Sequence, residues 1–427
     1  METPEAYLDR KNEELKLLDS CLGSPLALGR PTTVEEVIER KFRIAAALKA
    51  EHTLHDWALT ETAWTHPGQL KAGPFEFSYD YQRAGLEVRG PSFYEFDNRA
   101  VPQETIYTSS GMAAISALLL AFARVISGAD ILVLPGTYGE TLELIENYAR
   151  HLRLTQLKKS LAEVAAPIGR TRILLLDSCA PAGSYEATLN RAKPNLDLAI
   201  FDTTGFSAGS GRISRFLSWA RRWQIPIVLV RSHTKLDSLG VEFGRLGSAV
   251  FVAYEKNIAA QKQKLLTDLA SEMRKAVRLF GGAALPAHFP PFAGTLAYRE
   301  LTSKRMAAIL RNSRRASRYF ASALPGVAAE LHFAHGLYVA LASTTPQDET
   351  AAKRAAAQMS YDLNRVGFPI RHAGSFGFDF AATEWFHNST TGRYSVRVAV
   401  SDLPTKLWDE LTEAVARWWW MHQVVAA

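Results

Sequence analysis

The chain has 427 residues, of which 47% are hydrophobic and 22% charged, as in a soluble globular protein long enough for two domains. Its formal charge of +6 is mild, and the basic residues are not interleaved with aromatic ones as nucleic-acid binding requires. No run of about 18 apolar residues indicates a membrane helix. We therefore expect neither a nucleic-acid nor a membrane partner.

The first residues lack a basic segment followed by an apolar core, so we expect no secretory signal. Cys21 and Cys179 are too few for a disulfide framework or a cysteine metal site. His372, His387 and His422 do not have the spacing of metal ligands. These features predict a cytoplasmic protein without a bound metal.

The first 65 or so residues predict helices, one over 5–22 and one that opens at 32–36 with threonine as its cap. Their apolar pattern is too small for an independent core, so we expect residues 1–80 to form a helical arm that packs on another subunit. The turn-rich stretch 67–102 follows, and a loop of that length usually serves function or an interface.

The next part of the chain alternates short apolar strands with helices, which predicts a mainly parallel sheet covered on both faces. Strands are expected at 131–134, 172–177, 198–202, 225–230 and 247–252, and helices at 112–122, 140–151 and 212–223. We expect residues 81–290 to form this large domain.

The proline-rich stretch 286–291 reads as a linker. Beyond it, an α+β pattern predicts a smaller domain at residues 291–427. Its helices are expected at 301–323, 349–366 and 407–422, and its strands at 329–333, 337–342 and 394–400.

The stretch Arg231–Asp237 follows the apolar run 225–230. Ligands of open α/β sheets bind in the crevice at the carboxyl ends of the strands. Lys235 enters this crevice with the hydroxyls of Ser232 and Thr234 nearby, and our hypothesis is that it holds pyridoxal phosphate (PLP) as a Schiff base. The alternative is a surface lysine that caps a strand.

Asp202 ends another apolar strand, one helix and one strand before Lys235. PLP chemistry needs an acid beside the pyridine nitrogen, because protonation there makes the ring an electron sink. Tyr138, just after the strand at 131–134, can stack on a planar cofactor. The alternatives are a capping aspartate and a loop tyrosine.

Ser110, Gly111 and Met112 stand where the helix at 112–122 begins, and the N-terminus of a helix attracts phosphate. A simple helix cap is the alternative. Arg397 lies within an apolar strand, where its fork suits a carboxylate, and Ser375 could add a donor. A structural salt bridge remains the alternative for Arg397.

Five stretches, in order, resemble a known family. Ser110–Ile115 is similar to the Ser-Gly-Met-Ala-Ala of fold-type I PLP enzymes in the Cys/Met metabolism group, which contains cystathionine γ-synthase, cystathionine lyases and methionine γ-lyase. Tyr81-Gln82-Arg83 resembles its Tyr-x-Arg, and Tyr138–Thr141 its Tyr-Gly-Gly-Thr. Ser232–Lys235 resembles its Ser-x-Thr-Lys, and Tyr394–Val398 the strand of its substrate-carboxylate arginine.

This resemblance implies a fold-type I α/β protein with a mainly parallel, seven-stranded type of sheet and a smaller C-terminal domain. It implies PLP as cofactor and a homodimer or homotetramer whose subunits share the active site. The residues it assigns to PLP are Ser110, Gly111, Met112, Tyr138, Asp202, Ser232, Thr234 and Lys235, with Tyr81 and Arg83 from the partner chain, and those it assigns to substrate are Arg397 and Ser375.

Departures from the family indicate a rebuilt site, and one is an interval from Asp202 to Lys235 that is several residues longer than in the family. The family's Glu-x-Pro-x-Asn-Pro is replaced by Asp177–Pro181, so the asparagine expected near Ala180 is absent. Asp202 is followed by Thr203 instead of asparagine, and Lys235 by Leu236 instead of tyrosine.

The resemblance predicts β- or γ-elimination or replacement on an amino-acid substrate, as in a C–S or C–X lyase or a γ-synthase of a specialised biosynthetic pathway. Lys235 would remove the Cα proton, with Tyr138 and Asp202 as the other catalytic residues. The alternatives are a PLP-dependent aminotransferase and a non-catalytic PLP-fold scaffold or sensor. A nicotinamide dehydrogenase fits poorly, because no Gly-x-Gly-x-x-Gly follows an early strand.

Overall fold

The computed structural model describes residues 1–58, 70–78, 87–96, 101–161, 170–191, 194–253, 259–324, 329–331, 336–343, 345–388 and 392–423. The chain forms two compact units. The larger unit comprises Lys49–Thr234 and Phe243–Gly294, and the smaller unit comprises Met1–Leu48, Lys235–Glu242 and Thr295–Ala427. Within the described ranges, no helix is both long and apolar enough to cross a membrane.

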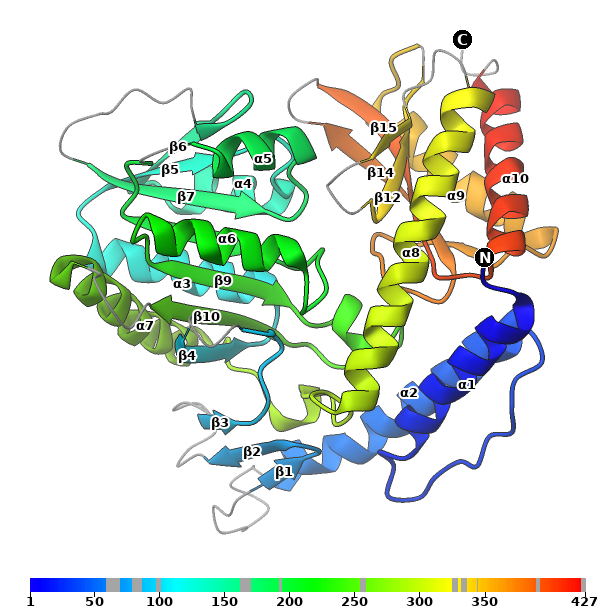
Figure 1. Ribbon diagram of the computed structural model, residues 1–427, viewed down its shortest axis with the longest axis horizontal. Helices are drawn as coiled ribbons and strands as arrows, with labels where there is room; N and C mark the ends of the chain where they lie inside the picture. The colour runs from blue at the N-terminus through cyan, green and yellow to red at the C-terminus, as the bar shows by residue number, and fades with distance from the viewer. Residues whose placement is uncertain are drawn as a thin grey trace. The chain divides into compact units, whose positions relative to one another are not determined.

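The larger unit is built on a mixed seven-stranded sheet with the strand order β4-β10-β9-β8-β7-β5-β6 (Figure 1). Strand β10 runs antiparallel to its neighbours β4 and β9, whereas the pairs from β9 to β6 are parallel. The strands are β4 (Val101–Thr108), β5 (Ala129–Val133), β6 (Leu152–Gln156), β7 (Thr171–Asp177), β8 (Leu198–Asp202), β9 (Ile227–Ser232) and β10 (Gly247–Ala253).

Both faces of this sheet are buried, which explains the continuous apolar runs of its strands. In β7, Ile173 and Leu175 join the core on one face, and Leu174 and Leu176 join the core on the other. Helices α3 (Gly111–Val125), α4 (Gly139–Tyr148) and α7 (Ala260–Phe280) cover the first face, and α5 (Ala182–Leu189) and α6 (Gly211–Arg222) the second. The parallel strands β5, β7, β8 and β9 therefore all end at one edge.

The strand predicted at 225–230 is displaced by two residues. Ile225 donates its N–H to Ala220 at the end of α6 instead of to a strand, and Pro226 has no N–H to donate. At the other end, pairing of Ser232 with Gly247 of β10 extends the strand. Lys235 consequently comes three residues after β9 ends. Helices α5 and α7 and strands β4 and β6 were not predicted.

The larger unit also contains a three-stranded antiparallel sheet of β1 (Leu70–Ala72), β2 (Phe75–Ser78) and β3 (Glu87–Arg89), within the stretch predicted as a long loop. A 3₁₀ turn, η4 (Pro286–His288), lies in the stretch that was predicted as a linker.

The smaller unit contains a five-stranded sheet with the order β11-β12-β15-β14-β13. Its strands are β11 (Ala329–Leu331), β12 (Tyr338–Leu341), β13 (Ile370–His372), β14 (Ala381–Asn388) and β15 (Arg393–Ala399). Helix α9 (Glu349–Arg365) packs on β13, β14 and β15, and α8 (Leu296–Ala323) packs on β11 and β12.

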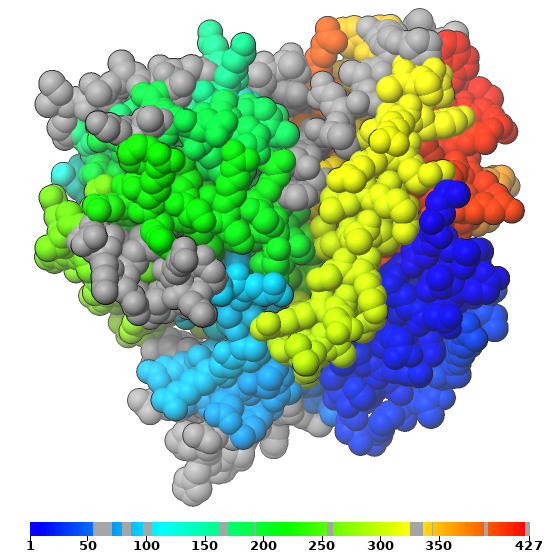
Figure 2. Space-filling model, in the orientation of Figure 1, coloured from blue at the N-terminus to red at the C-terminus, as the bar shows by residue number. Residues whose placement is uncertain are grey.

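Helices α1 (Pro4–Asp19) and α10 (Thr405–Gln423) both pack on α8. Figure 2 shows the first residues of the chain against α8 and α10, where Glu2 pairs with Arg311 at 2.9 Å and its N–H bonds the Thr405 hydroxyl at 3.2 Å. Residues of α2 (Val34–Ala58) divide between the two units. The expected domain limits at residues 80 and 290 remain predictions, but this grouping places the first 48 residues with the C-terminal segment.

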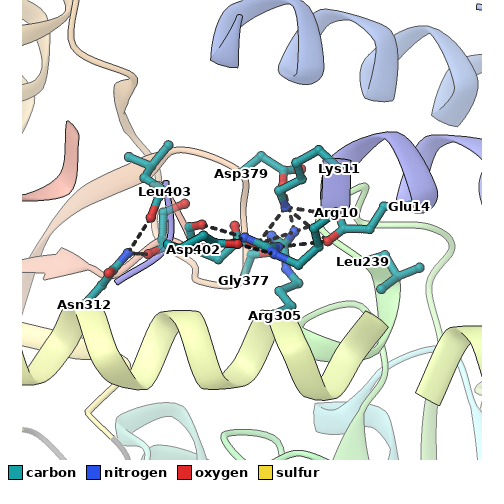
Figure 3. A network of polar contacts seen from close by, with 12 residues as sticks. Arg10, Lys11, Glu14, Leu239, Arg305, Asn312, Gly377, Asp379, Asp402 and Leu403 are labelled. Atoms are coloured by element: carbon teal, nitrogen blue, oxygen red, sulfur yellow. Dashed lines mark hydrogen bonds and ion pairs between the residues drawn. The ribbon is translucent and has the colours of Figure 1, made fainter. Parts of the chain in front are cut away.

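A buried ion network lies inside the smaller unit (Figure 3). It consists of the cations Arg10, Lys11, Lys41 and Arg305 and the carboxylates Glu14, Asp379 and Asp402. Asp379 lies 2.5 Å from the Lys11 ammonium and 2.7 Å from the Arg305 guanidinium, and Asp402 lies 2.6 Å from Lys11. Glu2 supplies a fourth negative charge at the rim, 2.9 Å from Arg10.

Candidate active site

Two carboxylates lie side by side at the carboxyl edge of the large sheet. Asp177 ends β7 and Asp202 ends β8, and the two residues are direct partners in the parallel pairing of these strands. Asp177 accepts backbone N–H groups of Tyr138 at 3.0 Å and of Cys179 at 2.7 Å. Asp202 accepts the N–H of Thr204 at 2.9 Å.

The pair is strained electrostatically. Burial, and then the nearby charge of Asp202, raise the pKa of Asp177 from 3.8 to about 7. Burial also raises the pKa of Asp202, against the opposing effects of its bonds to Thr204 and of the Arg231 guanidinium. Neither carboxylate forms a salt bridge with any residue that the structure describes. The site therefore favours a proton, or a cationic ligand, between the two acids.

The N-terminus of α3 lies next to the end of β9. A Cβ atom on Gly111 would stand 3.0 Å from the Ser232 Cβ atom and 3.2 Å from its backbone nitrogen, so glycine lets the helix approach the strand closely without crowding. The Ser110 hydroxyl accepts the N–H of Ala113 at 3.0 Å and is therefore a helix cap. The first N–H groups of the helix, including those of Gly111 and Met112, have no acceptor inside it.

Tyr138 is the N-cap residue of α4, and the residue is 42% exposed. Its backbone N–H donates to the Asp177 carboxylate at 3.0 Å. The structure thus places Tyr138 beside the carboxylate pair with an accessible ring, and stacking on a cofactor remains a prediction.

Thr203 and Thr204, which follow Asp202, hold the end of β9. The Thr204 hydroxyl accepts the N–H of Ser232 at 3.0 Å, and the Thr203 carbonyl accepts from Arg231 at 3.0 Å. Asp202 and Ser232, both predicted site residues, are therefore linked through one short hydrogen-bonded turn.

In the smaller unit, Lys235 belongs to a second cluster. Its ammonium donates to the Ser375 hydroxyl and lies 5.9 Å from the centre of the Phe376 ring. Phe376 packs edge-on against Tyr338, with ring centres 5.5 Å apart, and Tyr338 in turn packs on the Arg397 guanidinium at 4.4 Å. The structure thus brings together the predicted residues Lys235, Ser375 and Arg397.

Arg397 is paired with a carboxylate that the sequence reasoning did not single out. Its Nη2 donates to Glu384 Oε1 at 2.9 Å, and the two residues are direct partners on β14 and β15. Burial raises the pKa of Glu384, although Arg397, Tyr338 and Lys235 all act to lower it. The salt bridge that was left open for Arg397 is present in this structure.

The residues missed by sequence reasoning are Asp177, Thr204, Tyr338, Phe376 and Glu384. Asp177 ends an apolar strand just as Asp202 does, so the same signal could have found it. Tyr338 and Glu384 carried no such signal, because cross-strand neighbours are set by the register of the sheet. Thr204 and Phe376 lie outside the strands, where no apolar run marks them. Tyr81 and Arg83 lie outside the described residues, and Thr234 is the last residue of the larger unit before Lys235.

No protein-family model matches this sequence, and no curated protein matches it. Among solved structures, the chain is similar to the crystal structure of cystathionine gamma synthase from Xanthomonas oryzae pv. oryzae in complex with aminoacrylate and cysteine. The TM-score is 0.52 at 15% sequence identity, over 75% of this chain and 82% of that chain. This likeness concerns the fold. The chain therefore has the fold-type I α/β architecture of that synthase, which confirms the fold class predicted from the sequence.

Proposed function

We propose that this protein is a PLP-dependent enzyme that catalyses β- or γ-elimination or replacement on an amino-acid substrate. The observation that carries the proposal is the pair Asp177 and Asp202, two neighbouring acids with raised pKa values at the carboxyl edge of the sheet. The fold likeness to a cystathionine gamma synthase supports the same class of chemistry.

The residues present fit PLP at three points. The carboxylate pair offers a place for a protonated ring nitrogen, which would relieve the repulsion between the acids. The N-terminus of α3 at Gly111, close against Ser232, offers N–H groups to a phosphate. Lys235 follows Thr234 directly in the chain and offers an amine for covalent attachment.

When bound, PLP supplies an electron-withdrawing ring that stabilises negative charge on the substrate carbon next to the amino group. Asp202 would hold the ring nitrogen in its protonated form, and Tyr138 would cover the ring. The phosphate would be held by Ser110, Gly111, Met112, Ser232 and Thr234, with Tyr81 and Arg83 from the partner in a homodimer or homotetramer.

Lys235 would take the proton from the substrate carbon onto its Nζ atom once it is released from the cofactor. The Ser375 hydroxyl, which accepts a hydrogen bond from Nζ in this structure, would orient the amine. Loss of a β- or γ-substituent from the substrate then gives elimination, and capture by a second nucleophile gives replacement.

The first test is chemical trapping. The purified protein is incubated with PLP, reduced with borohydride and digested, and the modified peptide is located by mass spectrometry. We expect the adduct on Lys235 and its loss in Lys235→Ala. Lys264→Ala, which removes a lysine with a 74% exposed side chain, should leave the adduct unchanged. Equal labelling of many lysines, or labelling that survives Lys235→Ala, would contradict the proposal.

The second test identifies the reaction. Amino acids with leaving groups at the β or γ carbon are screened, and the products are analysed by mass spectrometry. Release of the leaving group is expected. A keto acid that retains the substituent, together with pyridoxamine phosphate, would instead identify an aminotransferase.

A further inference from the structure

Arg397 is already occupied by a carboxylate of its own chain. Glu384 lies opposite it on the neighbouring strand, with 2.9 Å between Nη2 and Oε1. Both side chains are largely buried, with 13% and 14% of their surfaces exposed. A substrate carboxylate that binds Arg397 would therefore have to share the guanidinium with Glu384 or displace it.

The guanidinium is fixed in place by aromatic rings. Its central carbon lies 4.4 Å from the centre of the Tyr338 ring and 4.0 Å from that of Phe386. These contacts combine cation–π attraction with packing and hold the plane of the fork. Arg397 cannot turn away from Glu384 without losing them.

Only part of the Arg397 fork remains for a ligand. Nη2 donates to Glu384, and Nε is buried without a hydrogen-bond partner. Nη1 makes no hydrogen bond to any residue in the described ranges. A bidentate carboxylate needs two nitrogens of the fork. Nη1 alone can therefore donate to only one oxygen atom of a ligand.

Glu384 is also tied to the cluster around Lys235. Tyr338 hydrogen-bonds its carboxylate, and the charge of Lys235 acts on it together with that of Arg397. A second carboxylate at this place would meet the negative charge of Glu384 at close range in a poorly solvated environment, where such repulsion is strong. A neutral carbonyl oxygen would not be repelled by Glu384 in this way.

We propose that Glu384 is a specificity-determining residue that keeps Arg397 from binding a free carboxylate, so that the substrate is an amino acid whose carboxyl group is masked as an amide, ester or thioester. The claim that the bound amino acid is a substrate rests on the proposed function. The binding preference itself rests only on Glu384, Arg397 and their surroundings. The masked carbonyl would accept a hydrogen bond from Nη1, and Glu384 would stay in place.

The test uses two small probes of nearly equal shape, propionate and propionamide, titrated into the full-length protein without PLP and followed by ligand-observed NMR. The wild-type protein should bind propionamide at least as tightly as propionate. Glu384→Gln should shift the ratio of the two affinities toward propionate by on the order of tenfold, because a charge-assisted bond to Arg397 becomes available. Adding Arg397→Gln to that variant should abolish the gain.

Glu349→Gln is the matched control, because Glu349 pairs with Lys353 on the surface of the same unit, and it should leave the ratio unchanged. The inference is overturned if wild-type protein already prefers propionate about tenfold. It is equally overturned if Glu384→Gln, shown by thermal melting to be folded, binds no propionate or keeps the wild-type ratio. Glu384 would then be only a structural cross-strand partner. Should Glu384→Gln not fold, the wild-type preference decides alone.

This experiment does not depend on the cofactor. If Lys235 forms no adduct with PLP, the proposed function fails while the probe affinities still stand. If Lys235 forms the adduct but the probes behave as a structural role predicts, the function stands and the substrate is a free amino acid.

Discussion

Buried carboxylates occur in both units, and their pKa values shift in opposite directions. In the smaller unit, burial alone would raise the pKa of Asp379, but Arg305, Lys11 and Lys41 hold it well below its usual range. The pKa of Asp402 is also lowered, by the charges of Arg305, Lys11 and Arg10. In the larger unit, Asp177 has no such partners among the described residues, and its pKa rises to about 7.

The difference separates two uses of a buried charge. The ion network of the smaller unit is completed by the chain itself, so it needs no ligand. The pair Asp177 and Asp202 is incomplete in the described chain, as expected where a ligand supplies the missing charge. The three predictions below test this contrast through stability, from the largest expected effect to the smallest.

Removing one partner of the network should be strongly destabilising. Asp379→Ala leaves the buried ends of Lys11, Lys41 and Arg305 undercompensated, and we expect a loss of about 3–5 kcal/mol in the free energy of unfolding. Urea unfolding measures it. Asp409→Ala is the control, because Asp409 pairs with Arg315 at a half-exposed site and should cost less than ~1 kcal/mol. Equal losses would show that the network is not structural.

Crowding the network from outside should cost less. Gly240 has a φ of +85°, and a Cβ atom there would lie 2.6 Å from Asp379 Oδ2 and 2.7 Å from Arg305 Nη2. Gly240→Ala should lose about 2–3 kcal/mol, from the strained backbone and the displaced ion pair. Gly367→Ala isolates the backbone effect, since Gly367 has a φ of +93° and nothing within 4 Å of the added atom. We expect it to lose about 1 kcal/mol.

Removing the charge of Asp177 should stabilise the protein, whereas removing Asp379 should destabilise it. Because the pKa of Asp177 is raised in the folded protein, its contribution to stability is complete below pH 3.8 and is lost as the pH rises through about 7. Without PLP, Asp177→Asn should therefore be more stable than wild type at pH 8, by about 1–2 kcal/mol. The advantage should vanish at pH 4.

The control for this variant is Asp130→Asn. Asp130 lies on β5 of the same sheet, and its buried carboxylate pairs with Arg153 at 2.7 Å and Arg170 at 3.0 Å. Its loss should reduce stability at pH 8. If both variants were destabilised to the same degree at pH 8, the contrast between paired and unpaired acids would be wrong.

The fold could be predicted well because its signals are local. The strand predicted at 198–202 is β8, and the helix expected at 212–223 differs from α6 by one residue at each end. Fully buried strands produce continuous apolar runs, and serine or threonine caps such as Ser110 mark where helices begin. The resemblance to fold-type I PLP enzymes then predicted how these strands and helices are arranged.

The polar interior could not be predicted from the same signals. Lys11 and Glu14 of α1 are charged residues within a predicted helix, and no local pattern marks them as interior, yet both are fully buried. Lys11 pairs with Asp379 and Asp402, 368 and 391 residues further along the chain, and one partner of Glu14 is Arg305, 291 residues away. Glu384 was missed for a related reason, since its pairing with Arg397 depends on the register of β14 and β15.

The ion network also sets an order of events during synthesis. Arg10 leaves the ribosome early, but its partner Asp402 is 392 residues further along the chain. At 5–20 residues per second, the two are made roughly 20–80 s apart. Throughout that interval the charges of α1 can pair only among the first residues, as Glu14 does with Arg10, Lys11 and Lys41, and the network stays without Asp379 and Asp402. The buried network of the smaller unit therefore cannot be completed until the end of synthesis, although it contains some of the first residues made.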